Sequence, residues 1–325
     1  MKILITGGAG YVGSNGALAF LDRGHKVTII DNLINGEKKL IPKRSAFLES
    51  DINNEKKISK LLKKTKFDVV IHYAALTSVP DSIKSPSKYY KNNFLKSKKF
   101  LKICLKYGLN NIIYSSTAGV YGDKKKKIDE KHSVKPKSPY AKSKLKFENH
   151  LKNIGKKTKL KYIILRYFNV GGADKFLRSG LTKNNGNLIK TLCEVATKKR
   201  KKIIIFGNNY KTKDGTTIRD YIHVTDLSKM HLVAAEKLVK DKNFKSDVFN
   251  CGYGFGFSTK ELIIFMQKIL SLRINFEYGK KRTGDIEQSV SKVSKFKKKF
   301  KWFPKYNKYN SLKKILKSSY NWEKK

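Results

Sequence analysis

A run of glycines directly after a short apolar segment is the feature that most constrains this fold. Residues 2–6 (KILIT) have the pattern of a buried strand, and Gly7, Gly10 and Gly13 follow at three-residue spacing where an amphipathic stretch begins. Such glycines permit a tight turn, a close approach of the backbone to a ligand, and close packing of helix on strand. The pattern therefore predicts a dinucleotide whose pyrophosphate lies at the N-terminus of the helix.

The first half of the chain alternates short β-branched runs with longer amphipathic stretches. The predicted strands cover residues 2–6, 26–31, 67–72, 111–115 and 162–166. The predicted helices cover residues 13–23, 55–64, 88–107 and 139–153. Repeated alternation of this kind is typical of a parallel sheet with helices on both faces. We therefore expect an α/β fold, a Rossmann-type doubly wound parallel sheet.

The second half has a different texture, rich in Gly, Asn and Lys, and predicts a smaller α/β lobe. Its expected elements are a helix at 187–198, strands at 202–206 and 221–224, a helix at 260–272 and a C-terminal helix. The predicted domains are a nucleotide-binding domain at 1–168, which residues 220–252 rejoin, and a substrate-binding lobe at 169–219 and 253–325.

The charge of the chain is strongly positive, because 73 Lys and Arg face 25 Asp and Glu, which gives a formal net charge of +48. A nucleic-acid partner must therefore be considered. A disordered basic tail is excluded, since hydrophobic residues make up 39% of the chain. The lysines are dispersed and lack interleaved aromatic side chains, which argues against specific nucleic-acid binding.

The cysteines and histidines predict neither disulfides nor a metal site. Cys104, Cys193 and Cys251 are far apart and odd in number, and the six histidines show no ligand spacing. No apolar run is long enough for a signal peptide or a membrane span, so we expect a cytoplasmic protein without a membrane partner.

Asp31 ends the second predicted strand and indicates which dinucleotide is bound. A carboxylate at this place accepts hydrogen bonds from the adenosine ribose hydroxyls and repels an additional 2′-phosphate. We therefore expect NAD, rather than NADP, as the cofactor.

Tyr140 and Lys144 lie one helical turn apart in the sequence YAKSK, so both project from one face of the predicted helix. A cation about 4 Å from a phenol, at an effective dielectric of about 20, is worth roughly 4 kcal/mol, or about three pKa units. We therefore expect Lys144 to lower the pKa of Tyr140 and to make it a usable base. Small hydroxyl residues in the stretch 114–122 follow a predicted strand and can relay a hydrogen bond between substrate and Tyr140.

At this point the sequence resembles the extended short-chain dehydrogenase/reductase family, and within it the branch that inverts carbon 4 of UDP-sugars. The resemblance covers nearly the whole chain. Its most specific motifs are TGGAGYVGS, DNLINGE, SSTAGVYGD, SPYAKSK, LRYFNVGGA, FGNNYKTKDGTTIRDYIHVTDL and RTGD. The long block, which begins at Phe206, belongs to the sugar-nucleotide lobe and is the most telling of these.

The resemblance implies roles for individual residues. It implies that Tyr140 is the general base and acid, that Lys144 holds the nicotinamide ribose, and that Thr117 bonds the reacting sugar oxygen. It implies NAD contacts at Gly7, Gly10, Tyr11, Val12, Gly13, Asp31, Asn32, Asn35, Asp51, Ile52, Tyr73, Ala74, Ala75, Asn92, Tyr140 and Lys144. It implies UDP-sugar contacts at Thr117, Asn169, Asn187, Leu188, Phe206, Arg219, Arg282 and Ser289, with the two arginines on the diphosphate.

The reaction implied by the resemblance is the interconversion of UDP-glucose and UDP-galactose through a 4-keto intermediate. A related 4,6-dehydration needs an additional acid and base after the threonine, where this chain has Ala118 and Gly119. The small Ser289, at a gate position, raises the alternative of N-acetylated UDP-sugars. A homodimer formed by helices 88–107 and 140–153 is implied as well, and the non-enzyme alternative is a basic protein that holds NAD or binds nucleic acid.

Overall fold

The computed structural model describes residues 1–124, 126–184, 186–282, 285–304 and 307–325. The chain forms two compact units. Unit 1 comprises Met1–Val120, Pro136–Arg166 and Ser228–Phe249, and unit 2 comprises Tyr121–Lys135, Tyr167–Leu227 and Asn250–Lys325. Segments 121–135 and 220–227 thus pack with unit 2, although the predicted domains group them with the nucleotide-binding part. For segment 121–135 the cause is Ile128, whose N–H donates to the Val290 carbonyl at 2.8 Å. The functional domain boundaries remain a prediction.

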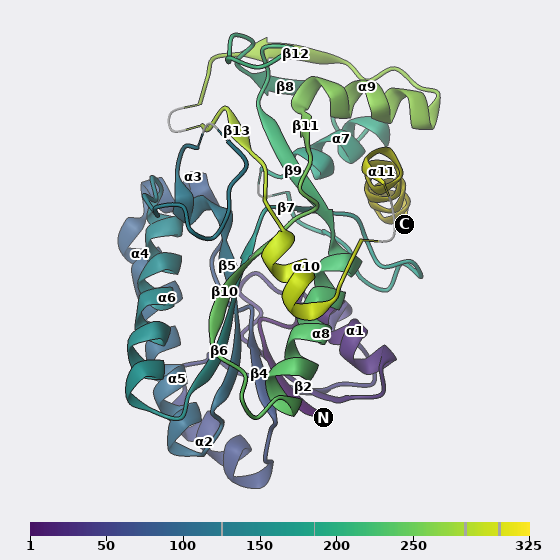
Figure 1. The fold of residues 1–325 in the computed structure, drawn as a ribbon. Coiled ribbons are helices and arrows are strands. Elements are labelled where there is room, and N and C mark those ends of the chain that lie inside the picture. The colour runs from purple at the N-terminus through teal and green to yellow at the C-terminus, as the bar shows by residue number, and fades with distance from the viewer. Residues whose placement is uncertain (125, 185, 283–284, 305–306) are drawn as a thin grey trace. The chain divides into compact units, whose positions relative to one another are not determined.

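A seven-stranded sheet in the order β10-β6-β5-β4-β1-β2-β3 forms the centre of unit 1 (Figure 1). Its strands are β1 (Lys2–Thr6), β2 (Lys26–Asp31), β3 (Ala46–Glu49), β4 (Val69–His72), β5 (Asn111–Thr117), β6 (Lys161–Tyr167) and β10 (Asp247–Cys251). β1 pairs in parallel with both β2 and β4, so the strand order reverses beside β1. Such a reversal opens a crevice at the carboxyl ends of the strands, where α/β proteins place their ligands.

Helices cover both faces of this sheet (Figure 1). One face carries α1 (Tyr11–Asp22) and α8 (Val224–Lys240), and the other carries α2 (Glu55–Lys64), α5 (Ser97–Lys106) and α6 (Pro139–Lys157). Between the second group of helices and the strands lies a core cluster that includes the fully buried Leu4, Phe100 and Phe147. This burial of apolar side chains is the main driving force for the layered arrangement.

The stretch 88–107 forms three successive pieces instead of the single predicted helix. These are α4 (Pro86–Tyr90), a π-helical segment η2 (Lys91–Lys96) and α5. Asn93 explains the change of winding: it is buried, and its side chain bonds both the N–H and the carbonyl of Leu76, at 2.8 and 3.0 Å. A single π-helical turn of this kind is frequent at functional sites. The short helix α3 (Val79–Lys84), which the sequence did not predict, precedes it.

Unit 2 contains two small sheets. In the first, β9 (Ile218–His223) pairs with β7 (Asn169–Gly171), β11 (Gly256–Ser258) and β13 (Gln288–Ser289). In the second, β8 (Ile203–Phe206) pairs in parallel with β12 (Phe276–Gly279). The helices of this unit are α7 (Leu188–Ala196), α9 (Thr259–Leu270), α10 (Ser294–Phe300) and α11 (Lys308–Lys324). Short 3₁₀ turns occur at Lys38–Leu40 and Ala118–Tyr121.

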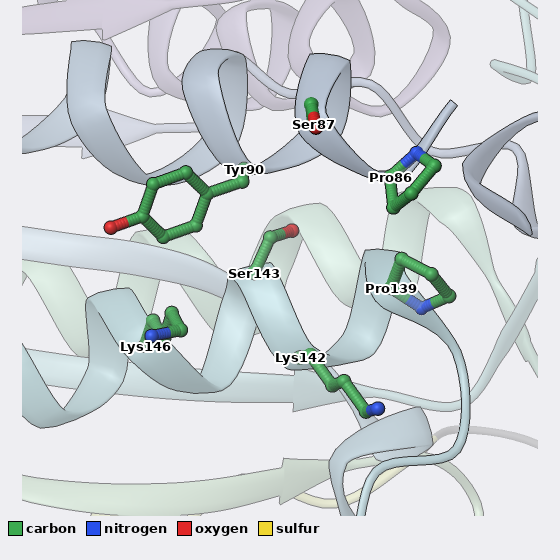
Figure 2. A pocket seen from close by; sticks show the side chains of 7 residues that line it. All are labelled: Pro86, Ser87, Tyr90, Pro139, Lys142, Ser143 and Lys146. Atoms are coloured by element: carbon green, nitrogen blue, oxygen red, sulfur yellow. The ribbon is translucent and has the colours of Figure 1, made fainter.

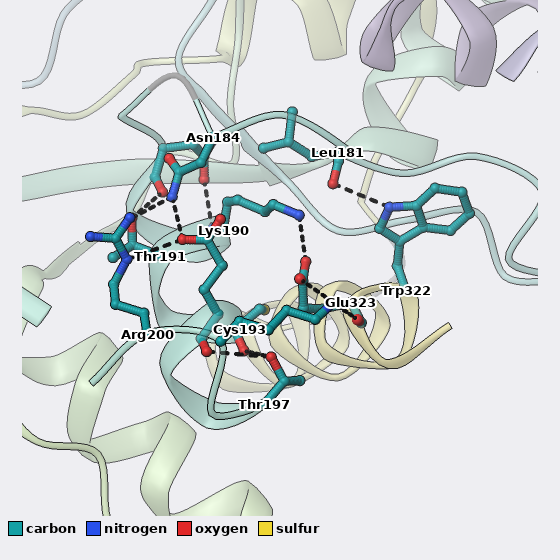
Figure 3. A network of polar contacts seen from close by, with 12 residues as sticks. Leu181, Asn184, Lys190, Thr191, Cys193, Thr197, Arg200, Trp322 and Glu323 are labelled. Atoms are coloured by element: carbon teal, nitrogen blue, oxygen red, sulfur yellow. Dashed lines mark hydrogen bonds and ion pairs between the residues drawn. The ribbon is translucent and has the colours of Figure 1, made fainter. Parts of the chain in front are cut away.

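The end of α11 is fastened to α7 and to the loop before it (Figure 3). The Glu323 carboxylate accepts hydrogen bonds from the ammonium groups of Lys190, at 2.5 Å, and Lys199, at 2.9 Å. The indole N–H of Trp322 donates to the carbonyl of Leu181 at 3.1 Å. These contacts fix the N-terminal part of α7, which begins immediately after Asn187.

Within the described residues, no helix is both long enough and apolar enough to cross a membrane.

Candidate active site

The glycine loop between β1 and α1 has the tight geometry that its sequence predicts. Gly7 has φ +72°, and a Cβ atom there would lie 2.6 Å from the backbone nitrogen of Ala74. A Cβ atom at Gly13 would lie 2.1 Å from the carbonyl oxygen of Gly7. At Gly10 the nearest atom to such a Cβ is 3.4 Å away, and α1 begins at the next residue without a side chain at its N-cap. The first turn, with Tyr11 and Val12, therefore presents the positive end of the helix to an anion.

Asp31 ties the end of β2 to this loop. Its Oδ2 accepts a hydrogen bond from the N–H of Ala9 at 3.0 Å, and its Oδ1 accepts one from the N–H of Leu33 at 2.9 Å. Burial raises the pKa of this carboxyl, while these backbone donors act in the opposite direction. Because each carboxylate oxygen has two acceptor sites, Asp31 can still accept hydrogen bonds from the hydroxyls of a ribose.

A second acidic residue, Asp51, forms a polar cluster with Asn32 and Lys96. Its Oδ2 accepts from the Asn32 amide at 3.1 Å and from the Lys96 ammonium at 2.5 Å. Although burial alone would raise the pKa of Asp51, the hydrogen bond from Lys96 holds it below its ordinary value. Ile52 next to it is buried, and Asn35 is exposed.

The segment after β4 lies against the glycine loop. The N–H of Ala74 donates to the Thr6 hydroxyl at 3.4 Å, and Ala75 is half-buried. Tyr73 is buried, with its ring 4.9 Å from that of His231 on α8. Of the two neighbouring asparagines, Asn92 is half-buried and donates to Asn93 at 3.1 Å.

Thr117, Tyr140 and Lys144 lie together in unit 1. Ser138 caps α6 by accepting a hydrogen bond from the N–H of Ala141 at 3.2 Å, so Tyr140 lies in the first helical turn. Thr117 ends β5 and is hydrogen-bonded to Tyr140. The Lys144 ammonium donates to the carbonyl of Ser115 at 2.7 Å. One strand end and one helix therefore supply a threonine, a tyrosine and a lysine to the same place.

Burial controls the protonation of this group. It raises the pKa of Tyr140 to about 12, against the hydrogen bond from Thr117, which lowers it. It lowers the pKa of Lys144 to about 7, against the charge of Glu148, which raises it. Desolvation is therefore the larger influence on the Tyr140 phenol, and the expected lowering of its pKa by Lys144 stays a prediction.

Seven residues predicted to contact the UDP-sugar lie in two groups in unit 2. In the first group, the Arg282 guanidinium lies 3.6 Å from the ring centroid of Phe206, and Arg219 lies 3.8 Å from the carboxylate of Asp285. Ser289 is in register with Arg219 in the pairing of β13 with β9. Thr283 and Gly284, which belong to the RTGD motif, lie outside the described residues.

The second group lies where β7 meets α7. Asn187 caps α7 by accepting from the N–H of Lys190 at 3.1 Å, and its amide donates to the carbonyl of Val170 at 3.3 Å. It is thus held next to Asn169, which is exposed in β7. Leu188, the first residue of α7, is half-buried.

Three residues of these clusters were missed in the sequence. Lys96 bears no signal that separates it from the many other lysines. Asn93 stands beside the residue chosen, Asn92, and only the π-helical winding decides which of the two turns inward. Asp285 lies in the quoted RTGD motif, three residues after the predicted diphosphate residue Arg282, and this proximity was the available signal.

Among the residues with defined placement, no group of three or more His, Cys, Asp or Glu side chains is arranged to hold a metal ion.

Comparison with known proteins defines the class of this chain. The model of the NAD dependent epimerase/dehydratase family matches residues 3–252, and the chain belongs to that family. Its relatives include a UDP-glucose 4-epimerase of Halalkalibacterium halodurans, 36% identical over 100% of this chain and 96% of the relative. Another is a UDP-glucose 4-epimerase of Azospirillum brasilense, 37% identical over 89% of this chain and 83% of the relative.

Solved structures of 4-epimerases are also similar to this chain. The UDP-glucose 4-epimerase from Bifidobacterium longum in complex with NAD⁺ and UDP is 30% identical, with a TM-score of 0.93 over 100% of this chain and 98% of that one. The UDP-Glc/GlcNAc 4-epimerase from Campylobacter jejuni is 40% identical, with a TM-score of 0.84 over 99% of each chain. These similarities confirm the resemblance, the α/β fold and an NAD-dependent epimerase as the enzyme type.

Proposed function

We propose that this enzyme interconverts UDP-glucose and UDP-galactose by inverting carbon 4 of the hexose. The observation that carries the proposal is the cluster of Thr117, Tyr140 and Lys144 at the end of β5 in a chain of the epimerase family. Tyrosine can move a proton, lysine can hold positive charge beside it, and threonine can bond a sugar hydroxyl.

The residues around the glycine loop fit NAD. The loop leaves space at Gly10 beside an uncapped helix N-terminus, and Asp31 offers carboxylate oxygens at the end of the next strand. The proposed NAD contacts are Gly7, Gly10, Tyr11, Val12, Gly13, Asp31, Asn32, Asn35, Asp51, Ile52, Tyr73, Ala74, Ala75 and Asn92, together with Tyr140 and Lys144. Bound NAD supplies a reversible hydride acceptor for carbon 4.

In the proposed mechanism Tyr140 accepts the proton of the 4-hydroxyl as the C4–H bond gives up its hydride, which leaves a 4-ketopyranose. Thr117 holds the sugar oxygen next to the phenol, and the charge of Lys144 favours the phenolate. After the keto sugar has turned, Tyr140 returns the proton to the oxygen, while hydride adds to the other face of carbon 4. Tyr140 thus serves as base and then as acid, and no net oxidation results.

The UDP part of the substrate needs firm anchorage while the hexose turns. Arginine is scarce in this chain, eight residues by count of the sequence, and two of them, Arg219 and Arg282, lie among the proposed substrate residues. Guanidinium groups bind phosphate oxygens in pairs, which makes these two suitable for a diphosphate. The proposed UDP-sugar contacts are Thr117, Asn169, Asn187, Leu188, Phe206, Arg219, Arg282 and Ser289.

A second candidate activity is the epimerisation of N-acetylated UDP-hexosamines. Ser289 is small and lies in register with Arg219, so a bulkier sugar meets little side-chain volume there. A relative with 40% identity bears the name UDP-Glc/GlcNAc 4-epimerase. Turnover of UDP-GlcNAc at a rate comparable to that of UDP-glucose would support this activity, and background turnover alone would refute it.

We also propose that two copies associate through the helices at 88–107 and 140–153, which form α4, η2, α5 and α6 in the structure, and that the protein acts in the cytoplasm. Val79, Ile83, Tyr90 and Leu95 expose between 39% and 58% of their surface on the helices of this region. A groove of about 330 Å³ lies between α4 and α6 (Figure 2). It is lined by Pro86, Ser87, Tyr90, Pro139, Lys142, Ser143 and Lys146.

The proposed function is tested with the purified protein and UDP-galactose. We expect NAD to be released on heat denaturation and UDP-glucose to accumulate. Tyr140→Phe should abolish turnover and keep both the fold and the bound NAD, because it removes only the hydroxyl that transfers the proton, while the ring and the other proposed NAD contacts remain. A Tyr140→Phe variant with normal turnover would contradict the proposal.

A further inference from the structure

A buried carboxylate lies on the same helix as the proposed catalytic residues Tyr140 and Lys144. Glu148 is on α6, one helical turn after Lys144 and two after Tyr140, and its exposed fraction is 0%. An isolated charge at such a place costs several kcal/mol, so a glutamate persists there only when partners satisfy it.

Both oxygens of Glu148 have charged or hydroxyl donors. Oε1 accepts from the Ser116 hydroxyl at 2.5 Å and from Nε of Arg166 at 3.0 Å. Oε2 accepts from Nη2 of Arg166 at 2.5 Å. Arg166 itself is only 3% exposed. A single carboxylate thus joins α6 to the ends of β5 and β6.

Ser116 connects this ion pair to the catalytic atoms. The residue before it, Ser115, accepts the hydrogen bond of the Lys144 ammonium at 2.7 Å, and the residue after it, Thr117, is bonded to Tyr140. A movement of Ser116 would therefore displace the acceptor of Lys144 and the partner of Tyr140 together.

We propose that Glu148 is a positioning residue for the epimerase reaction: it holds the end of β5 against α6 through Ser116, and its charge favours the protonated form of the neighbouring Lys144. This inference rests on the proposed function, because it assigns Glu148 a part in the chemistry of Tyr140 and Lys144. An alternative is that the Glu148–Arg166 pair only stabilises the fold.

The surroundings of Lys144 make Glu148 its nearby source of negative charge. From β5 the ring of Tyr114 lies 4.9 Å from the ammonium, and from β4 comes His72, whose pKa burial lowers to about 3, so that it is neutral. On α6 the carboxylate of Glu148 acts on the ammonium, and this carboxylate is itself paired with Arg166 of β6 and lies 4.0 Å from the ammonium of Lys152.

The sign of the effect follows from these charges. Burial lowers the pKa of Lys144 to about 7, and Glu148 raises it. Removing the carboxylate charge removes this raising influence, so the pKa of Lys144 falls further. Without the Glu148 charge, Lys144 would lose its proton, and with it its ability to assist Tyr140, at a lower pH than in the wild type.

The test uses the holoenzyme and Glu148→Gln. We expect the basic limb of the kcat profile for UDP-galactose to move to lower pH by about one unit or more, since loss of a close opposite charge shifts a pKa by about that much. KM should stay near the wild-type value, because the residues proposed to hold UDP are not part of this network. The pH dependence of Lys144 acetylation by acetic anhydride, followed by mass spectrometry, should shift in the same direction without any turnover being measured.

Matched variants separate charge from packing. Ser116→Ala keeps the Glu148 charge and should lower kcat without moving the basic limb. Glu236→Gln makes the same chemical change in unit 1, at a side chain 22% exposed, and should alter neither. If Glu148→Gln does not fold, the double variant Glu148→Gln with Arg166→Gln removes both charges of the buried pair. Its basic limb should again move down, because the carboxylate that raises the pKa of Lys144 is gone.

The two proposals fail in different ways. A wild-type protein without turnover would overturn the proposed function. An active wild type whose Glu148→Gln variant, or the double variant in its place, keeps the wild-type basic limb and acetylation profile would overturn the role of Glu148 and leave the function intact.

Discussion

At the scale of single residues, the proposed site keeps its lysine and tyrosine close to their neutral forms. Burial shifts the pKa of Lys144 down to about 7 and that of Tyr140 up to about 12. Both shifts disfavour charge, so the ammonium that assists the tyrosine depends on neighbouring groups rather than on the ordinary basicity of lysine.

The shift at Lys144 predicts how stability depends on pH in the nucleotide-free protein. The folded state binds fewer protons than the unfolded state between pH 7 and 10.5, the ordinary value, so the free energy of unfolding should rise with pH across this window. Lys144→Met should lack the rise, which amounts to at most about 4–5 kcal/mol. Urea denaturation of both proteins at several pH values measures it, and equal slopes would contradict the account.

Tyr114 offers a stability test of another kind. Its hydroxyl is buried, and the described residues include no hydrogen-bond partner for it. A buried polar group without a partner costs roughly 1–3 kcal/mol, so Tyr114→Phe should leave the protein equally stable or stabilise it by about 1 kcal/mol. Thermal or urea unfolding checks this. A loss of stability comparable to that of a core cavity would show that the hydroxyl has a partner after all.

At the scale of elements, the periodicity of apolar residues predicted the bounds of those strands and helices that local sequence determines. The strands at 2–6 and 26–31 and the helix at 55–64 have the bounds that the sequence predicted. The predicted helix at 88–107 was wrong as a single element, because the tertiary contact of Asn93 with Leu76 imposes the π-helical turn. β12 and β13, four and two residues long, take their conformation from the strands beside them and have no pattern of their own.

The junction of α7 and α11 gives a prediction for an element contact. Burial alone would raise the pKa of Glu323, but hydrogen bonds from Lys190 and Lys199 hold it below 4.5. Lys190→Met should destabilise unit 2 by about 1.5–3 kcal/mol at neutral pH, because a bond to a buried charge is lost. A depressed carboxyl pKa contributes stability above its unfolded value, so the difference should shrink as the pH falls below about 4.

Lys199 is the matched control for this contact. It bonds the same carboxylate, but its side chain is 57% exposed against 10% for Lys190. Exposed ion pairs contribute about 0–1 kcal/mol, so Lys199→Met should cost clearly less than Lys190→Met in the same denaturation experiment. Equal losses would mean that burial does not govern this network.

At the scale of the whole molecule, the large positive net charge governs how two copies of this chain interact. A formal net charge of +48 makes two copies repel each other, and the proposed dimer face itself carries Lys142 and Lys146. Salt screens exposed charges with a Debye length of about 8 Å at 0.15 M. Dimerisation measured by analytical ultracentrifugation should therefore strengthen from low to moderate salt. A dimer that weakens with added salt would contradict the proposed face.

Not every residue of the proposed site could be predicted from the sequence. Gly7, Gly13, Tyr140 and Lys144 could be predicted as site residues because their pattern is local, and their roles stay predictions. Glu148 and Asn93 were not predicted, because their importance depends on contacts with Arg166 and Leu76, which belong to other elements of the fold. Spacing could likewise predict a cation near Tyr140, but it could not reveal the burial that raises the pKa of this phenol.

The measurement that tests the central claim most directly follows the hydrogen on carbon 4. The enzyme is incubated with UDP-galactose labelled with deuterium at that carbon, in ordinary water, and the product is examined by NMR. A mechanism that returns the same hydrogen to carbon 4 without exchange with solvent predicts UDP-glucose that retains the deuterium at carbon 4. Product that has lost the label to solvent, or no product at all, would contradict it.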